Sequence, residues 1–198
     1  MTDISHARPL KVGSVERRAL GWTGMMALIA TEASLFVYLE FSYYYFVAQF
    51  GRSWLPDKLP EFTLAAPETV ILLLSSVTCW WAERGLKRGR EGTAVLGLVI
   101  SFVIGVIFIT LQFIEWLKKP FAIYSNSYAS LYFTVTGFHM MHVVVGLVVL
   151  VFITLWTALG YFDHERHSAL SIGIIYWHFV DAVWLTVFFA FYITPRLG

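Results

Sequence analysis

The feature that most constrains this chain is a pair of long stretches without a charged residue. Gly92–Ile114 contains 23 residues and Pro120–Phe162 contains 43, and neither stretch holds Asp, Glu, Lys or Arg. A helix needs about 20 predominantly apolar residues to cross the roughly 30 Å hydrocarbon core of a bilayer. Both stretches are therefore predicted to span a membrane.

Three further apolar stretches each contain one or two acidic residues and are otherwise long enough to cross. The connectors between the stretches are short and rich in proline, glycine and charge, which is typical of loops in water. We therefore predict an all-α integral membrane bundle of five transmembrane helices, forming a single domain over residues 1–198. The predicted spans cover residues 20–47, 64–82, 93–116, 128–157 and 168–194.

Composition and charge exclude several classes of function. Hydrophobic residues make up 58% of the chain and charged residues only 14%, against about 25% charged in ordinary soluble domains. The net charge of +1 provides no basic field that would attract nucleic acid. The single cysteine excludes an internal disulfide and any site built from several thiolates.

The distribution of Lys and Arg predicts the orientation in the membrane. Nine of these residues lie before the first span or in the connectors after the second and fourth spans, and five lie on the opposite side. Cytoplasmic segments carry the excess of positive charge, so the N-terminus is predicted inside and the C-terminus outside. The charged residues 1–19 are expected to form a short cytoplasmic lead-in rather than a signal peptide.

Ionisable side chains inside the predicted spans are the candidate functional residues. Glu32 lies about 18 Å into the first span and Asp181 is comparably deep in the last, where an acid costs about 2.5–3.5 kcal/mol. His139 and His142 are three residues apart, share a helix face and match Glu32 in depth. Such groups are functional candidates by default, so Glu32, His139 and His142 form the predicted polar site.

Two other polar pairs are predicted to be structural. His178 and Asp181 share a face of the last span, where a contact between imidazole and carboxylate is geometrically available. Gln112 and Glu115 lie at the end of the third span and are expected to cap it or to bridge to the loop at 118–126. From the residues alone, the histidines and acids fit a proton site, a haem or metal site, a lipid-headgroup pocket, or interhelical hydrogen bonds.

A stripe of small residues predicts close helix packing. Gly97, Ser101 and Gly105 recur every four residues along the third span, which lets a neighbouring backbone approach closely.

Several motifs occur in an order that resembles a known family. They are Thr31-Glu32-Ala33, Pro67 with Ser75-Ser76-Val77-Thr78, Leu111-Gln112-Phe113-Ile114-Glu115-Trp116, Thr136-Gly137-Phe138-His139 with His142-Val143, and Trp177-His178-Phe179-Val180-Asp181-Ala182-Val183-Trp184. Together they resemble subunit III of the haem-copper terminal oxidases, the cytochrome c oxidase subunit III family, in its five-helix bacterial form. Longer members carry two additional N-terminal helices, and members commonly have glycine after the first histidine, where this chain has Met140.

The resemblance implies an accessory, non-catalytic subunit of an oxygen-reducing, proton-translocating complex in aerobic respiratory electron transport. The chain itself would bind no haem, copper or other metal, since these belong to partner subunits, but it would bind phospholipid. Its partners would be oxidase subunits I and II, with small subunits or a respiratory supercomplex, in the bacterial plasma membrane. Glu32 would match a carbodiimide-reactive carboxyl within reach of His139, in a subunit that sustains proton uptake and the stability of subunit I.

Two kinds of alternative stay open from the sequence. Similar chains accompany quinol oxidases as subunit III, and related accessory proteins accompany nitric oxide reductases. A different class is a membrane cytochrome that holds haem through His139, His142 or His178. Such a protein would show a Soret band when purified alone, whereas the accessory subunit would be colourless.

Overall fold

Five long helices make up most of the chain. The computed structural model describes residues 20–56, 59–60, 62–162 and 167–197. Its long helices are α1 (Leu20–Phe50), α2 (Phe62–Lys87), α3 (Glu91–Lys118), α4 (Ser127–Ala158) and α5 (Ser168–Phe188). Short helical segments follow α1 and α5, namely η1 (Gly51–Trp54), η2 (Phe189–Ile193) and α6 (Thr194–Leu197). No strand occurs in these ranges, and all 5 long helices are apolar enough to cross a membrane, which confirms the predicted fold class.

The helices extend beyond the apolar stretches that predicted them. α2 continues to Lys87, five residues beyond the predicted end of the second span at residue 82. The apolar stretch ends where the bilayer is expected to end, whereas the helix is carried further by an ion pair of 2.8 Å between Glu83 and Lys87, one turn apart. The turn to α3 is short and contains Gly89 at φ +70°, a left-handed conformation that favours glycine.

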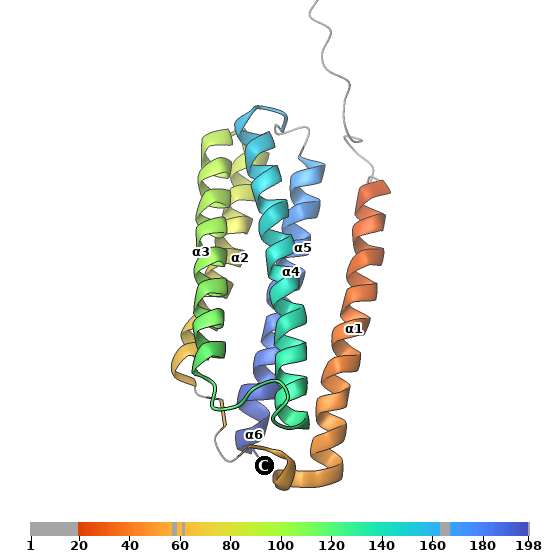
Figure 1. The fold of residues 1–198 in the computed structure, drawn as a ribbon. Helices are drawn as coiled ribbons and strands as arrows, with labels where there is room; N and C mark the ends of the chain where they lie inside the picture. The colour runs from red at the N-terminus through yellow and green to blue at the C-terminus, as the bar shows by residue number, and fades with distance from the viewer. Residues whose placement is uncertain (1–19, 57–58, 61, 163–166, 198) are drawn as a thin grey trace, which may run out of the picture.

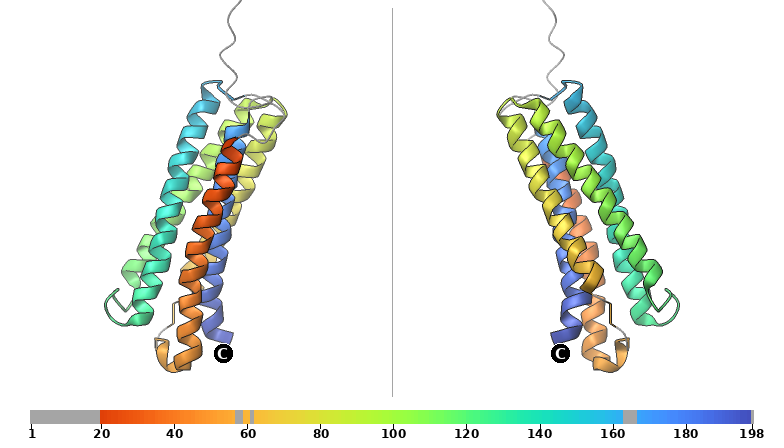
Figure 2. Two further views of the ribbon diagram at one scale, coloured as in Figure 1. Left: turned by 90° about the vertical axis from the view of Figure 1, so that its right-hand side faces the viewer. Right: turned by 90° about the vertical axis from the view of Figure 1, so that its left-hand side faces the viewer.

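Four of the helices form a bundle, and α1 lies at its side. α2, α3, α4 and α5 pack around a common core, while α1 contacts α4 and α5 (Figures 1 and 2). In an apolar stretch of 18 residues within α1, only 6% is buried inside the chain. The corresponding share is 33–56% in the other four long helices. Most of the surface of α1 therefore points away from the other four helices.

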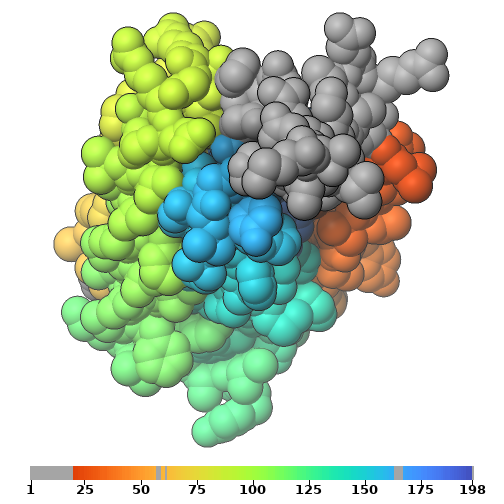
Figure 3. Space-filling view, turned by 90° about the horizontal axis from the view of Figure 1, so that it is seen from above, coloured from red at the N-terminus to blue at the C-terminus, as the bar shows by residue number. Residues whose placement is uncertain are grey.

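The described residues begin and end at opposite ends of the bundle. α1 starts at the end where α2 turns into α3, and α6 lies at the other end (Figure 1). Seen end-on, α1 lies at the edge opposite α2 and α3 (Figure 3). The first and last described residues lie at opposite ends because the chain runs along the bundle an odd number of times. Which end faces the cytoplasm stays a prediction. The lead-in at 1–19 lies outside the described residues.

The small-residue stripe of α3 packs as predicted. A Cβ added at Gly97 would lie 2.8 Å from Ala82 Cβ, and one added at Gly105 would lie 2.8 Å from Trp177 Cη2. Ser101 Oγ, between them, lies 2.6 Å from Thr78 Oγ1. The absence of side chains at the two glycines therefore allows α3 to approach α2 near Gly97 and leaves room at Gly105 for Leu147 of α4 and Trp177 of α5.

Candidate functional site

The site is centred on a contact between a glutamate of α1 and a histidine of α4. His142 Nε2 lies 3.0 Å from Glu32 Oε2. The side chains are 12% and 30% exposed, so the pair is partly buried at the surface where α1 meets the bundle. Glu32 follows the first residue of α1 by twelve positions, which places it about 18 Å along the helix. The acid predicted to be functional therefore has a partner at the same depth.

The other ring nitrogen of His142 fixes how many protons the pair holds. His142 Nδ1 lies 2.6 Å from the carbonyl oxygen of Phe138, which can only accept a hydrogen bond. Nδ1 therefore carries a hydrogen, and the bond between Nε2 and Glu32 requires one more. That proton resides on Nε2 in an ion pair or on the Glu32 carboxyl in a neutral pair. In both forms the two side chains share one titratable proton.

A pocket of about 310 Å³ opens beside this pair. Glu32 and His142 line it together with a mostly apolar wall from α1, α4 and α5, formed by Leu28, Leu35, Phe138, Met141, Val145 and Tyr176. The Met141 side chain is 59% exposed at the edge of the pocket, so it faces outward rather than blocking the approach of α1. The arrangement can hold a proton next to an apolar ligand.

His139 does not make the contact with Glu32 that the resemblance implied. Its side chain is buried, and neither ring nitrogen has a hydrogen-bond partner among the described residues. The ring lies 5.0 Å from that of Trp184 and 6.0 Å from that of Phe108, measured between centroids. Phe36 contacts both histidine rings, so they share a face, but only His142, one turn further along, reaches Glu32.

The predicted pair of His178 and Asp181 is bridged by a residue of another helix. Ser76 of α2 donates a hydrogen bond to Asp181 Oδ2, and its Oγ lies 2.8 Å from His178 Nδ1. A serine hydroxyl has one hydrogen, so His178 Nδ1 donates to Ser76 Oγ. The order of donation is therefore His178 to Ser76 to Asp181, and the group joins α5 to α2.

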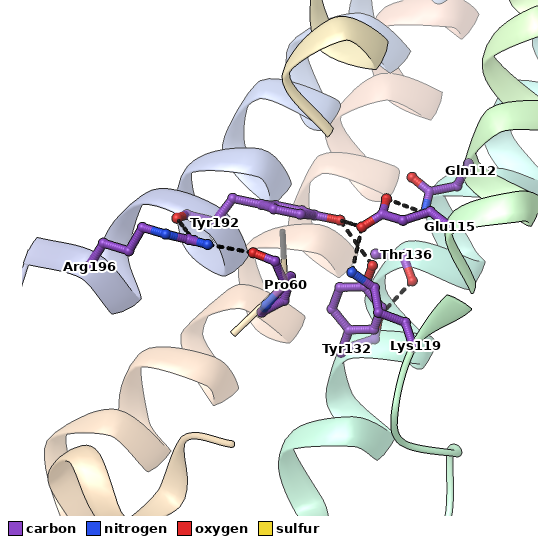
Figure 4. Close-up of polar contacts among 8 residues, drawn as sticks. All are labelled: Pro60, Gln112, Glu115, Lys119, Tyr132, Thr136, Tyr192 and Arg196. Atoms are coloured by element: carbon purple, nitrogen blue, oxygen red, sulfur yellow. Dashed lines mark hydrogen bonds and ion pairs between the residues drawn. The ribbon is translucent and has the colours of Figure 1, made fainter. Parts of the chain in front are cut away.

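Glu115 lies in a larger polar cluster at the α6 end of the bundle (Figure 4). Its Oε1 pairs with Lys119, one turn away, and accepts a hydrogen bond of 2.7 Å from the Tyr192 hydroxyl. Gln112 Nε2 donates to Oε2 at 3.4 Å. Tyr192 OH also lies 2.9 Å from Tyr132 OH. The expected bridge from Glu115 to the following loop is therefore made through Lys119, the residue that directly follows α3.

Three polar residues of the spans were not predicted to form sites. Ser76 carries the bridge just described, and its place beside His178 depends on how α2 and α5 pack. Thr186 Oγ1 donates to Glu40 Oε1 at 2.7 Å, which joins α5 to α1. Glu68 is completely buried, and the signal that could have found it is its position within an apolar stretch.

Comparison with known proteins identifies the family. Residues 14–195 match the family model for cytochrome c oxidase subunit III. Cytochrome c oxidase subunit 3 of Scyliorhinus canicula is 33% identical over 176 residues, which cover 85% of this chain and 67% of the relative. The protein of the same name from Anopheles gambiae is 31% identical over 194 residues, which cover 94% of this chain and 71% of the relative. Because the match extends over nearly all of its helices, this chain belongs to the cytochrome c oxidase subunit III family.

Proposed function

We propose that this chain is a non-catalytic accessory subunit of cytochrome c oxidase, in which the Glu32–His142 pair holds a proton beside bound lipid. Membership of the family makes the chain a subunit of an oxidoreductase complex. The observation that carries the finer proposal is the 3.0 Å contact between Glu32 and His142 at the edge of an apolar pocket. This contact places a titratable proton beside an apolar surface that suits an acyl chain.

The depth of the pair supports a functional role. An acid near the middle of a bilayer is costly. Little of α1 is buried against the other helices, so packing of α1 does not explain why an acid lies there. Glu40, nearer the end of the same helix, is hydrogen-bonded by Thr186 and already joins α1 to α5. Glu32 is therefore available to serve proton uptake and stability of the catalytic subunit, with lipid in the pocket.

The partners of the proposed subunit are oxidase subunits I and II, which would hold the haem and copper centres. Small subunits or a supercomplex would add further contacts to the exposed surface of α1. The relatives reported above come from animals, so the bacterial plasma membrane expected from the resemblance stays a prediction. The choice of cytochrome c or quinol as electron donor also stays a prediction.

The proposal that this chain holds no haem is supported by the surroundings of its span histidines. Nitrogens of His142 and His178 are engaged by Phe138, Glu32 and Ser76. The His139 ring is enclosed by aromatic side chains. An absorption spectrum of the purified chain tests this directly, because a Soret band would favour the membrane cytochrome instead.

Two substitutions of Glu32 separate its proton from its hydrogen bond. Glu32→Leu removes both, whereas Glu32→Gln keeps a donor for His142 Nε2 without a titratable proton. In the purified complex we expect both variants to keep most of the initial oxygen consumption and to lose activity sooner during turnover. Phospholipid retained by the complex should fall in Glu32→Leu and stay near the wild-type amount in Glu32→Gln.

Glu40→Gln is the matched control, because it replaces another acid of the same helix that accepts a hydrogen bond from α5. It should retain both lipid and endurance. Complete loss of initial turnover in a normally assembled Glu32 variant would contradict the accessory role. Wild-type endurance and lipid content in Glu32→Leu would contradict the role of the pair.

A further inference from the structure

A buried carboxyl outside the site described above lies toward the opposite end of the bundle from the start of α1. Glu68 of α2 has no exposed surface, and neither of its oxygens has a hydrogen-bond partner among the described residues. It follows Phe62, the first residue of α2, by six positions, which places it about 9 Å along the helix. The Glu32–His142 pair lies on other helices and makes no use of it.

The groups around Glu68 leave an excess of acceptors. Glu115 and Lys119 both lie within electrostatic range of the Glu68 carboxyl. Lys119 is paired with Glu115, and Gln112 turns its amide nitrogen to Glu115 at 3.4 Å. The Gln112 carbonyl oxygen is buried without a partner, as are both oxygens of Glu68. These three buried acceptor oxygens therefore have no hydrogen-bond donor among the described side chains.

The charges in this cluster also leave Glu68 without a counter-ion among the described residues. Lys119 is used by Glu115, and the Arg196 guanidinium donates to the carbonyl oxygens of Tyr192 and Pro60. An isolated carboxylate is very costly to bury, whereas its protonated form is much less so. The carboxyl therefore fits the surroundings only when it carries a proton.

A pocket connects this cluster to the end of the bundle. Its volume is about 280 Å³, and it is lined by Leu64, Glu115, Lys118 and Lys119 together with residues of the two adjoining loops. Leu64 precedes Glu68 by one helical turn and so lies on the same face of α2. Glu115 lines the pocket, whereas Glu68 does not and lies one helical turn further along α2 than Leu64.

We propose that Glu68 is a second proton-binding site, in which a neutral carboxylic acid is linked by buried water to Gln112 and Glu115. Water provides the donors that the three acceptor oxygens lack, and the Glu68 hydroxyl donates in turn to water or to the Gln112 carbonyl oxygen. The proton exchanges with the membrane surface through the pocket at the α6 end. This site does not depend on the role proposed for Glu32.

Infrared difference spectroscopy of the intact oxidase complex tests the protonation. We expect Glu68→Gln to remove a carbonyl-stretching band of a protonated carboxylic acid, and that band to shift on transfer of the wild type to deuterium oxide. Glu32→Gln is the matched control and should leave this band in place. A spectrum of Glu68→Gln that still contains every protonated-carboxyl band of the wild type would overturn the proposal.

Stability of paired variants tests the assignment of Lys119 independently of spectroscopy. Lys119→Met strands the Glu115 carboxylate, so it should lower the amount of chain retained in the complex. Adding Glu115→Gln should restore that amount, whereas adding Glu68→Gln should not. Rescue by Glu68→Gln instead would show that Glu68 is the ionised partner of Lys119 and would overturn the proposal.

Discussion

Trp177 is held between two glycines, and this contact gives the sharpest prediction about how the bundle is assembled. A Cβ at Gly105 of α3 would lie 2.8 Å from Trp177 Cη2 and 2.7 Å from Leu147 Cδ2. A Cβ at Gly146 of α4 would lie 2.8 Å from Trp177 Cε3. The indole cannot move freely, since its Nε1 donates to Ser75 Oγ at 2.9 Å.

Gly105→Ala and Gly146→Ala are each expected to destabilise the chain by about 1–3 kcal/mol, the usual cost of inserting a methyl group into a packed core. Each methyl group pushes the same ring, so the two costs should not add independently. The double variant should differ from the sum of the single variants by about 0.5–3 kcal/mol. Trp177→Phe removes the ring atoms that clash and should make Gly105→Ala less costly than it is beside tryptophan.

Retention of this chain in the purified complex, measured at increasing concentrations of a denaturing detergent, provides the assay. Gly24→Ala is the matched control, because nothing lies within 4 Å of the added Cβ. Alanine at an unhindered helical position is favoured over glycine by about 0.5–1 kcal/mol, so the control should be as stable as the wild type or more so. Equal retention of Gly105→Ala and Gly24→Ala would refute the reasoning.

Two further predictions concern interactions that hold helix ends and interfaces. Asp181→Leu removes the acceptor of the Ser76 hydroxyl, which should cost about 0.6–2 kcal/mol and lower the yield of assembled complex. Asp181→Asn keeps an acceptor oxygen and should assemble normally. Normal yields from Asp181→Leu would contradict this prediction. Asn126→Ala removes the side-chain oxygen that accepts from Ala129 N at 2.7 Å and should destabilise the start of α4 by about 0.5–2 kcal/mol. Faster hydrogen exchange confined to the first turn of α4 would support the capping role, and unchanged exchange there would refute it.

The number of helices and their approximate positions could be predicted because bilayer thickness sets a length that charge-free stretches reveal. The ends of the helices could not. Charge marks where the hydrocarbon ends, but α2 continues as a helix through Arg84 to Lys87 in the region where water is available. The stripe of Gly97, Ser101 and Gly105 was predicted correctly, since its periodicity on one helix contains the packing information.

The partners of the polar residues depended on contacts between helices. Periodicity placed His139 and His142 on one face, yet the position of α1 decides that His142 reaches Glu32 while His139 lies among aromatic rings. Ser76 bridges the polar pair of α5 because α2 packs against α5, which spacing within α5 could not reveal. No polar residue one helical turn from Glu68 pointed to a site in the sequence. Only the packed bundle reveals that its carboxyl is buried without a hydrogen-bond partner among the described residues.

The most direct measurement of the central proposal compares the oxidase purified with this chain and after its removal. The accessory role predicts the same haem content and nearly the same initial oxygen consumption per catalytic complex in both preparations. It also predicts that the preparation without the chain loses activity sooner during continuous turnover. Loss of haem together with the chain, or equal endurance in the two preparations, would contradict the proposal.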